Sequence, residues 1–193
     1  DYDLSIFKWF NQKNKKKGVK KIKLKYGENP NQKAYYISDS EKNLFKSKLY
    51  GNNLGYNNIL DISEGLNCLN EFTEPTCVII KHNNPCGVAS ANNIKSAYLK
   101  AFESDPISSF GGVVLLNRKI DLNIAKVIKK KFYEIIVAPK FSKTSLEELK
   151  LKKRLIIIDS SKLVKNSKLN FKSVDSGVLY QEFNSFKISK SKI

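Results

Sequence analysis

The 193-residue chain is poor in several residue types, and the shortage of cysteine and histidine argues against disulfide-rich and metal-binding proteins. It has one histidine, one tryptophan, three cysteines and no methionine. Three cysteines cannot all pair within one chain, and Cys68, Cys77 and Cys86 lack the C-x-x-C spacing of a metal or redox site. His82 and Cys86 would supply only two ligands, too few for a zinc centre. We therefore predict reduced thiols, typical of a cytosolic protein, and no metal site.

Long apolar runs are also missing. No stretch approaches the roughly 18 apolar residues that a membrane span needs. The apolar beginning runs straight into a lysine-rich stretch at 13–17 and lacks the order of a secretory signal. We accordingly predict a cytoplasmic location and no membrane partner. Asp1 stands where a start methionine would be, which predicts that the chain is an internal piece of a longer protein.

Arginine is scarce although the net charge is +17. Only Arg118 and Arg154 are arginines among the 35 basic residues. Proteins that read bases or phosphates with bidentate hydrogen bonds favour arginine, and no basic motif interleaved with aromatic residues is present. We interpret the charge as a solvated, lysine-rich surface and expect no nucleic-acid partner. A basic nucleic-acid-binding module is the rival interpretation, because such a charge attracts phosphates.

What the chain does contain is a series of short β-branched runs alternating with amphipathic segments. This order is typical of an α/β fold, and we predict a three-layer, mostly parallel sheet with helices on both faces. Strands are expected at 22–26, 34–38, 76–80, 112–116, 134–138 and 155–158. Helices are expected at 1–17, 59–72 and 91–102, after a cap at Asp121, and from a capping box at 144–147.

The only histidine, His82, follows the apolar run at 77–80 and precedes a Pro/Gly turn. This pattern predicts a strand end opening into a loop, where α/β folds place their chemistry. Histidine readily exchanges a proton near neutral pH, so His82 is the first candidate for proton transfer. Neighbours in a regular strand point to opposite faces, so Lys81 and His82 reach one substrate only if the strand ends at about Ile80. Pro85 favours such a break.

Four polar, glycine-bearing segments interrupt the predicted framework. They read Leu24-Lys25-Tyr26-Gly27-Glu28-Asn29-Pro30-Asn31-Gln32, Gly51-Asn52-Asn53-Leu54-Gly55-Tyr56-Asn57-Asn58, Lys81-His82-Asn83-Asn84-Pro85-Cys86-Gly87 and Asp105-Pro106-Ile107-Ser108-Ser109-Phe110-Gly111-Gly112. In sequence, order and spacing they resemble the formyltransferase domain of the bifunctional purine biosynthesis family, AICAR transformylase/IMP cyclohydrolase. The resemblance covers about residues 20–182.

The resemblance implies a domain organisation and an activity. Residues 1–20 would end a preceding cyclohydrolase domain, and 21–193 would form an incomplete, N-terminal, cytidine-deaminase-like subdomain of the transformylase domain, needing no zinc. The implied reaction of purine biosynthesis transfers a formyl group from the cosubstrate 10-formyltetrahydrofolate to the 5-amino group of AICAR, giving FAICAR. The family enzymes are homodimers. IMP cyclohydrolase activity is expected only from the upstream domain, and the piece alone is expected to be inactive.

The resemblance also implies roles for individual residues. Formyl transfer removes a proton from a weakly nucleophilic amine and stabilises charge on a tetrahedral intermediate. We expect His82 to accept that proton and Lys81 to supply positive charge or relay a proton. The substrate-binding residues would be Lys25, Tyr26, Gly111 and Glu134. The supporting loop positions would be Asn84, Pro85, Cys86, Gly87, Ser109 and Phe110.

The departures from the family pattern include three in the polar segments: Lys25 replaces an arginine, Asn31 a histidine and Gly55 a serine. A lysine meets a phosphate as a point charge and lacks the bidentate fork of arginine. The departure at Lys25 therefore predicts weaker or differently oriented nucleotide binding. Together the three departures leave open a further hypothesis, a scaffold that keeps the fold without catalysis.

Overall fold

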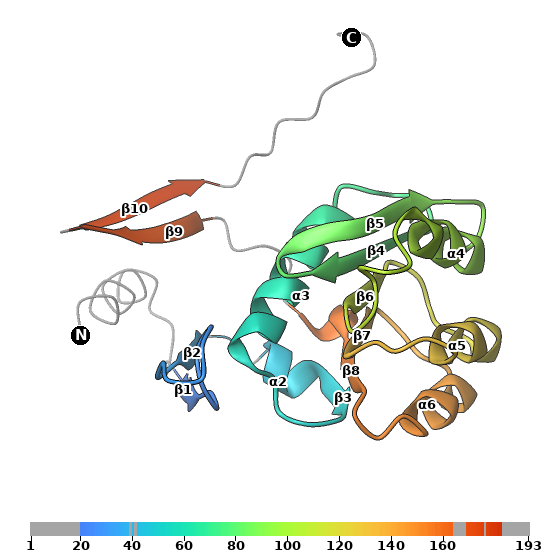
Figure 1. Ribbon diagram of the computed structural model, residues 1–193, viewed down its shortest axis with the longest axis horizontal. Helices are drawn as coiled ribbons and strands as arrows, with labels where there is room; N and C mark the ends of the chain where they lie inside the picture. Colours follow the sequence, from blue (N-terminus) through green and yellow to red (C-terminus); the bar gives the residue numbers. More distant parts are fainter. Residues whose placement is uncertain (1–19, 39, 41, 164–168, 176, 183–193) are drawn as a thin grey trace, which may run out of the picture. The chain divides into compact units, whose positions relative to one another are not determined.

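The computed structural model describes residues 20–38, 40, 42–163, 169–175 and 177–182, and the chain divides into two compact units (Figure 1). Gly18–Leu163 form the larger unit, and Asp1–Lys17 with Val164–Ile193 form the smaller one. In the smaller unit, β9 (Leu169–Val174) and β10 (Gly177–Glu182) pair as an antiparallel hairpin. The helix predicted over 1–17 lies outside the described residues.

A mixed six-stranded sheet in the order β3-β8-β7-β6-β4-β5 is the centre of the larger unit (Figure 1). Its strands are β3 (Lys48–Tyr50), β4 (Thr76–Lys81), β5 (Asn84–Ser90), β6 (Val113–Leu116), β7 (Ile135–Ala138) and β8 (Ile156–Asp159). Neighbours pair in parallel across β6, β7 and β8, and antiparallel at β3–β8, β6–β4 and β4–β5. Four of the six strands, β5 to β8, therefore run in one direction, which confirms the predicted mostly parallel sheet. The sequence did not predict the antiparallel pairing at both margins.

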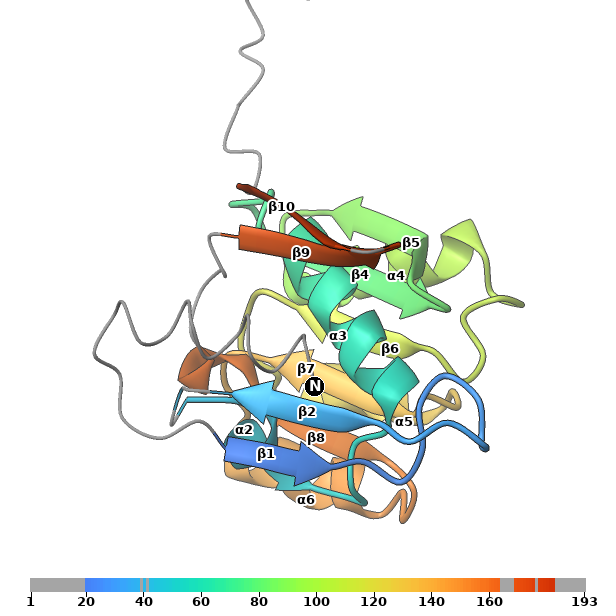
Figure 2. The ribbon, with the colours of Figure 1, turned by 90° about the vertical axis from the view of Figure 1, so that its left-hand side faces the viewer.

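Helices cover both faces of this sheet, as predicted. They are α2 (Leu44–Ser47), α3 (Tyr56–Leu69), α4 (Ile94–Ser104), α5 (Leu122–Lys129) and α6 (Lys143–Lys150). Figure 2 views the sheet from the face that α3 covers, and α4, α5 and α6 lie on the opposite face. In the described part of the chain, no helix has both the length and the apolar character to cross a membrane.

The two faces follow from the alternation of side chains along each strand. On β4, Ile80 belongs to the same buried cluster as Ile62 of α3, whereas its neighbour Ile79 belongs to the cluster that contains Tyr98 of α4. The strand is consequently apolar on both sides, which is why it reads as an uninterrupted apolar run in the sequence.

The main difference from the predicted fold is β5, where the sequence indicated a loop. This strand pairs with β4 from Thr76↔Ser90 to Lys81↔Asn84, so the two strands form a hairpin. Pro85 obscured it, because proline lacks the N–H that a central strand needs and is tolerated only where a strand lies at the margin of a sheet. Two residues form the turn, His82 with φ 52° and Asn83 with φ 63°, as a type I′ turn requires. Accordingly β4 ends at Lys81, one residue after the Ile80 that the sequence indicated.

Several boundaries are set by capping residues. The Asp121 cap is confirmed, since its Oδ1 accepts from the Ile124 N–H at 3.0 Å. Helix α6 instead begins after Ser142, whose Oγ accepts from the Ser145 N–H at 3.1 Å, so the predicted capping box starts too late. The predicted strands near 22–26 and 34–38 are an antiparallel pair, β1 (Lys20–Lys23) and β2 (Tyr35–Ser38).

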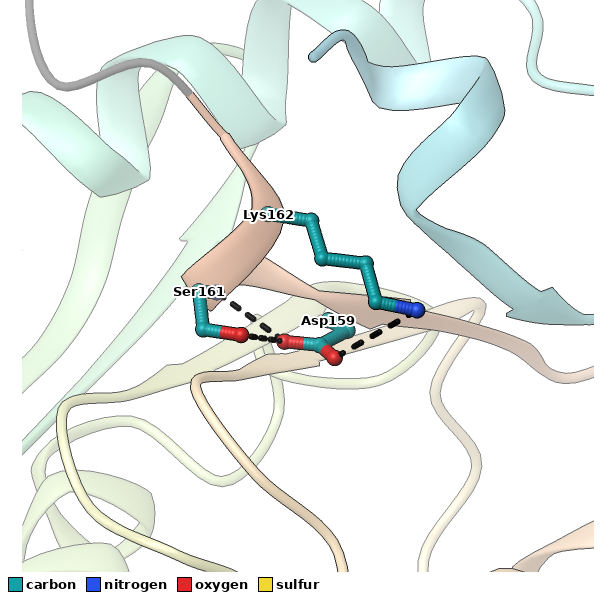
Figure 3. A network of polar contacts seen from close by, with 3 residues as sticks. All are labelled: Asp159, Ser161 and Lys162. Carbon is teal, nitrogen blue, oxygen red and sulfur yellow. Dashed lines mark hydrogen bonds and ion pairs between the residues drawn. The ribbon is translucent and has the colours of Figure 1, made fainter.

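Side chains also fix the end of β8. Asp159 Oδ1 accepts from the Ser161 N–H at 3.0 Å and from Ser161 Oγ at 2.5 Å, and its Oδ2 lies 3.8 Å from Lys162 Nζ (Figure 3). These contacts turn the chain into the short 3₁₀ helix η1 (Ser160–Lys162). Since Asp159 is the last residue of β8, the network stands at the carboxyl ends of the parallel strands.

The close approach of β5 to α4 predicts a stability effect. A Cβ added at Gly87 would stand 2.0 Å from the Ala101 carbonyl oxygen, whereas a Cβ added at Gly177 would meet nothing within 4 Å. We expect Gly87→Ala to lower the free energy of unfolding by about 1–3 kcal/mol, because β5 must move away from α4. The control, Gly177→Ala, is expected to change it little. Urea denaturation followed by circular dichroism measures both, and equal stability of the two variants would contradict this packing.

Candidate functional site

Residues from all four polar segments are linked along one row of strand ends, where β4 ends and β6, β7 and β8 begin. We call this row of strand ends the edge of the sheet. The register pairs Ile80 with Val113, Val113 with Ile135 and Ile135 with Ile156. The sequence argument placed the chemistry where parallel strands end. The edge instead carries the amino ends of β6, β7 and β8, because β4 runs antiparallel to β6. The two strands that run the other way, β4 and β3, contribute their carboxyl ends.

Lys81 is held at this edge by the 105–112 segment. Its Nζ donates to the Phe110 carbonyl oxygen at 2.5 Å. The next residue, Gly111, has φ +72°, and a Cβ added there would stand 3.9 Å from Lys81 Nζ. The Gly111 N–H donates to the Phe132 carbonyl oxygen at 2.9 Å, which ties the segment to the residues before β7. Glycine therefore gives the left-handed backbone without strain and leaves the ammonium uncrowded.

His82 occupies the hairpin turn and is exposed. Its carbonyl oxygen accepts from Asn84 Nδ2 at 3.0 Å, and the Asn83 N–H donates to Asp61 Oδ1 of α3 at 2.7 Å. The turn is thus fixed through its backbone, while no described residue hydrogen-bonds the imidazole of His82. Because His82 has a left-handed backbone, the alternation of a regular strand does not separate it from Lys81.

Glu134 reaches the same edge from the residue before β7. Its N–H donates to the Gly112 carbonyl oxygen at 3.1 Å, and its Oε2 accepts from Asn58 Nδ2 at 3.2 Å. Asn58 is itself oriented, because its Oδ1 accepts from the N–H of Gly55, the residue before α3, at 3.0 Å. The Asn58 side chain therefore both reaches back to the residue before the helix and binds the carboxylate.

Among the described residues, one hydrogen bond joins the 24–32 segment to the edge. Asn57 Nδ2 donates to the Glu28 carbonyl oxygen at 3.4 Å. Lys25 is exposed, and its Nζ lies 5.5 Å from the centroid of the half-buried Tyr26 ring. No hydrogen bond joins either residue to Lys81 within the described ranges. The structure therefore brings the backbone of this segment to the edge, but it does not link Lys25 and Tyr26 directly to the predicted catalytic pair.

Sequence reasoning assigned no role to Asn58, the last residue of the 51–58 segment, and did not single out Asp61. Both lie in the first two turns of α3, and each contacts a different segment, Asn58 the Glu134 carboxylate and Asp61 the hairpin turn. The available signal was two polar side chains three positions apart, which share one face of a helix. That face becomes meaningful only when the packing of α3 on the sheet is known.

A buried pair of tyrosines supports the 105–112 segment from the opposite side. The hydroxyls of Tyr98 and Tyr133 lie 3.1 Å apart, and the rings meet edge to face with centroids at 6.3 Å. Burial raises the pKa of both tyrosines, and hydrogen bonds with Tyr98 and then Ser109 partly oppose the rise at Tyr133. Ser109 Oγ also donates to the Pro106 carbonyl oxygen at 2.9 Å, so this hydroxyl group connects the tyrosines with the loop.

Burial raises the pKa of all three cysteine thiols, which disfavours a nucleophilic role. All three are free thiols. Cys86 Sγ lies 3.5 Å from the Ile79 carbonyl oxygen, and burial is the main cause that raises the pKa of its thiol. A raised pKa keeps a thiol protonated and unreactive. Among the described residues, no group of three or more histidine, cysteine, aspartate or glutamate side chains is arranged to hold a metal ion.

The loop that carries Phe110 and Gly111 begins at a carboxylate whose protonation should affect stability. Asp105 Oδ1 accepts from the Ser108 N–H at 2.8 Å, and its hydrogen bonds with Ser108 lower the pKa of the carboxyl group. A lowered folded-state pKa gives stability that is present above the unfolded-state pKa and is lost as the pH falls through the folded-state value.

We therefore expect Asp105→Asn to destabilise the protein at pH 7, and the difference from wild type to shrink as the pH falls below about 4. Thermal denaturation at a series of pH values measures this difference. A difference that stays constant from pH 7 to pH 2.5 would show that the charge of Asp105 does not stabilise the loop.

Comparison with known proteins gives a consistent result. The family model described as AICARFT/IMPCHase bienzyme matches residues 1–193. A protein of Caldicellulosiruptor bescii named bifunctional purine biosynthesis protein PurH is 46% identical over 197 residues, covering 94% of this chain and 38% of the relative. PurH proteins of Buchnera aphidicola subsp. Schizaphis graminum (43% identical, 86% and 33%) and Wigglesworthia glossinidia brevipalpis (40% identical, 99% and 40%) also match. The chain thus spans between 33% and 40% of the length of these relatives.

Proposed function

The chain belongs to the AICARFT/IMPCHase bienzyme family, as its four polar segments predicted, and from this premise we propose that it carries the formyl-transfer site of a bifunctional enzyme of purine biosynthesis. The reaction moves a formyl group from 10-formyltetrahydrofolate to the 5-amino group of AICAR. The observation that supports it most strongly is the meeting of Lys81, Gly111 and Glu134 at one edge of the sheet beside the hairpin turn that holds His82.

The proposed chemistry assigns one task to His82 and another to Lys81. The amine nitrogen attacks the formyl carbon, and the free imidazole of His82 accepts the proton that the amine loses. The carbonyl oxygen becomes an oxyanion, which the ammonium of Lys81 stabilises. When the intermediate collapses, the bond between the formyl carbon and the folate N10 breaks. His82 then returns its proton to N10, so that protons balance over the reaction.

The contacts of Lys81 suit this task. An ammonium group has three N–H donors, and the Phe110 carbonyl oxygen takes one of them. Two donors remain for an oxyanion or a bound substrate. Since the loop holds the ammonium in place before any substrate arrives, little reorganisation is needed as charge develops. Glycine at position 111 keeps the adjoining backbone accessible to a flat aromatic ligand.

Glu134 is proposed to bind the nucleotide substrate. Asn58 occupies only its Oε2, and no described residue donates to its Oε1. A carboxylate oriented in this way accepts hydrogen bonds from an amine or from hydroxyl groups. Lys25 and Tyr26 are proposed to contact the same nucleotide, the lysine as a point charge for its phosphate. In this proposal the working enzyme is a cytoplasmic homodimer, with residues 1–20 closing a cyclohydrolase domain and 21–193 beginning the transformylase domain.

Two glycine variants test the role of His82 in the full-length enzyme. Both His82→Gly and Asn83→Gly place glycine at a left-handed turn position, so both preserve the hairpin, but only the first removes an imidazole. We expect His82→Gly to lower kcat for formyl transfer by about 10²- to 10⁴-fold, as loss of a general base does, while cyclohydrolase activity is unchanged. Asn83→Gly should keep both activities.

Steady-state assays of the two half-reactions give the result. Equal losses in both variants would assign the effect to the turn, and full activity of His82→Gly would refute the proposed base. A wild-type enzyme that performs cyclohydrolysis but no formyl transfer would favour the alternative of a scaffold without catalysis.

A further inference from the structure

Three hydroxyl groups lie together in the apolar core beneath the 105–112 segment. Tyr98 is 1% exposed, Ser109 2% and Tyr133 5%. The two tyrosines belong to the buried cluster that α4 and α5 share with the sheet. Phenylalanine and alanine would fill nearly the same space, and burying a hydroxyl group costs free energy unless it is hydrogen-bonded. Packing alone therefore does not explain these hydroxyl groups, and their hydrogen bonds indicate what they do.

The hydrogen bonds among the three groups run in one direction. Ser109 Oγ has one hydrogen, and it donates this hydrogen to the Pro106 carbonyl oxygen at 2.9 Å, since a carbonyl group can only accept. In the hydrogen bond between Ser109 and Tyr133, the phenol must then be the donor. The Tyr133 oxygen is left to accept from the Tyr98 hydroxyl, 3.1 Å away. Tyr133 thus binds the 105–112 segment, and Tyr98 binds Tyr133.

Ser109 connects these hydroxyl groups to Lys81. The backbone of Ser109 is fixed on both sides, because its N–H donates to the Asp105 carbonyl oxygen at 3.2 Å and its carbonyl oxygen accepts from the Gly112 N–H at 3.0 Å. The next carbonyl oxygen, that of Phe110, accepts from Lys81 Nζ. The Phe110 ring is 63% exposed and does not anchor its residue in the core. The position of the acceptor for Lys81 therefore depends on how Ser109 is held.

We propose that Tyr133 is a positioning residue for Lys81. Its hydroxyl group holds Ser109, and the adjoining peptide carbonyl in turn holds the ammonium where the oxyanion of formyl transfer forms. The inference rests on the proposed function, which gives Lys81 the task of stabilising that oxyanion. A small displacement of such a donor slows the chemical step, because the stabilisation depends on geometry that is set before the charge develops. One hydroxyl group in the core should therefore affect the rate although it touches no reacting atom.

Two phenylalanine variants of the full-length enzyme separate positioning from packing. Tyr133→Phe and Tyr98→Phe each remove one buried hydroxyl group and the hydrogen bond between the rings, but only Tyr133→Phe also removes the donor to Ser109. We expect Tyr133→Phe to lower kcat for formyl transfer about tenfold, which corresponds to the loss of one hydrogen bond in the transition state. Tyr98→Phe, the matched control, should leave kcat near the wild-type value.

Acetylation of Lys81 reports on its position without any turnover. The ammonium must leave the Phe110 carbonyl oxygen and lose a proton before its nitrogen can attack acetic anhydride, so a loosened segment speeds acetylation. We expect the acetylation rate of Lys81, measured by mass spectrometry, to rise severalfold in Tyr133→Phe and to stay unchanged in Tyr98→Phe. The exposed Lys140, which follows the carboxyl end of β7, serves as the internal reference.

The outcomes separate this inference from the proposed function. Equal losses of kcat in the two phenylalanine variants, or an unchanged acetylation rate of Lys81 in Tyr133→Phe, overturn the positioning role. If the wild-type enzyme performs no formyl transfer, the proposed function fails, and acetylation alone then decides whether Tyr133 positions Lys81. A second variant, Ser109→Ala, removes the acceptor instead of the donor and should reproduce both effects, so the test stands even if Tyr133→Phe does not fold.

Discussion

The antiparallel pairing of β4 with β6 is the constraint on which the site depends. Because β4 runs against its neighbour, its last residue, Lys81, stands beside the backbone of 111–112 at the beginning of β6. Glu134 then follows one strand further, at the beginning of β7. With β4 reversed, the same lysine would stand at the other edge, separated by the length of a four-residue strand, about 13 Å. The hairpin with β5 fixes this direction from the other side.

Local sequence patterns predicted the layers of the fold well. The bounds of β4, β6, β7 and β8 differ from those predicted by at most one residue, because each strand is an apolar run buried on both faces. Strand direction could not be predicted in this way, since it depends on pairing between segments far apart in the chain. The strand β5 escaped notice because Pro85 and its polar neighbours read as a loop, and only its place at the margin of the sheet makes them compatible with pairing.

The residues of the site likewise include some that the sequence predicted and some that only the packing reveals. Motif resemblance identified Lys81, Gly111 and Glu134, which the structure links through backbone and side-chain contacts. It assigned no role to Asn58 or Asp61, because their contacts follow from how closely α3 lies on the sheet. Gly65 permits that approach: a Cβ added there would stand 2.3 Å from a methyl carbon of Leu115. The absence of a side chain at Gly65 thus lets α3 lie close enough to the sheet for Asn58 and Asp61 to reach the edge.

The left-handed backbone of His82 has a consequence for the history of the chain. A residue with a β-carbon pays about 1–2 kcal/mol for this conformation, whereas glycine adopts it freely. With the role proposed for His82, folding and chemistry would select for different residues at position 82. A lineage that no longer needs the imidazole gains stability by exchanging it, so drift there should be fast and directional. On the proposed role, the residue at this position in a descendant would indicate whether selection for the reaction has persisted.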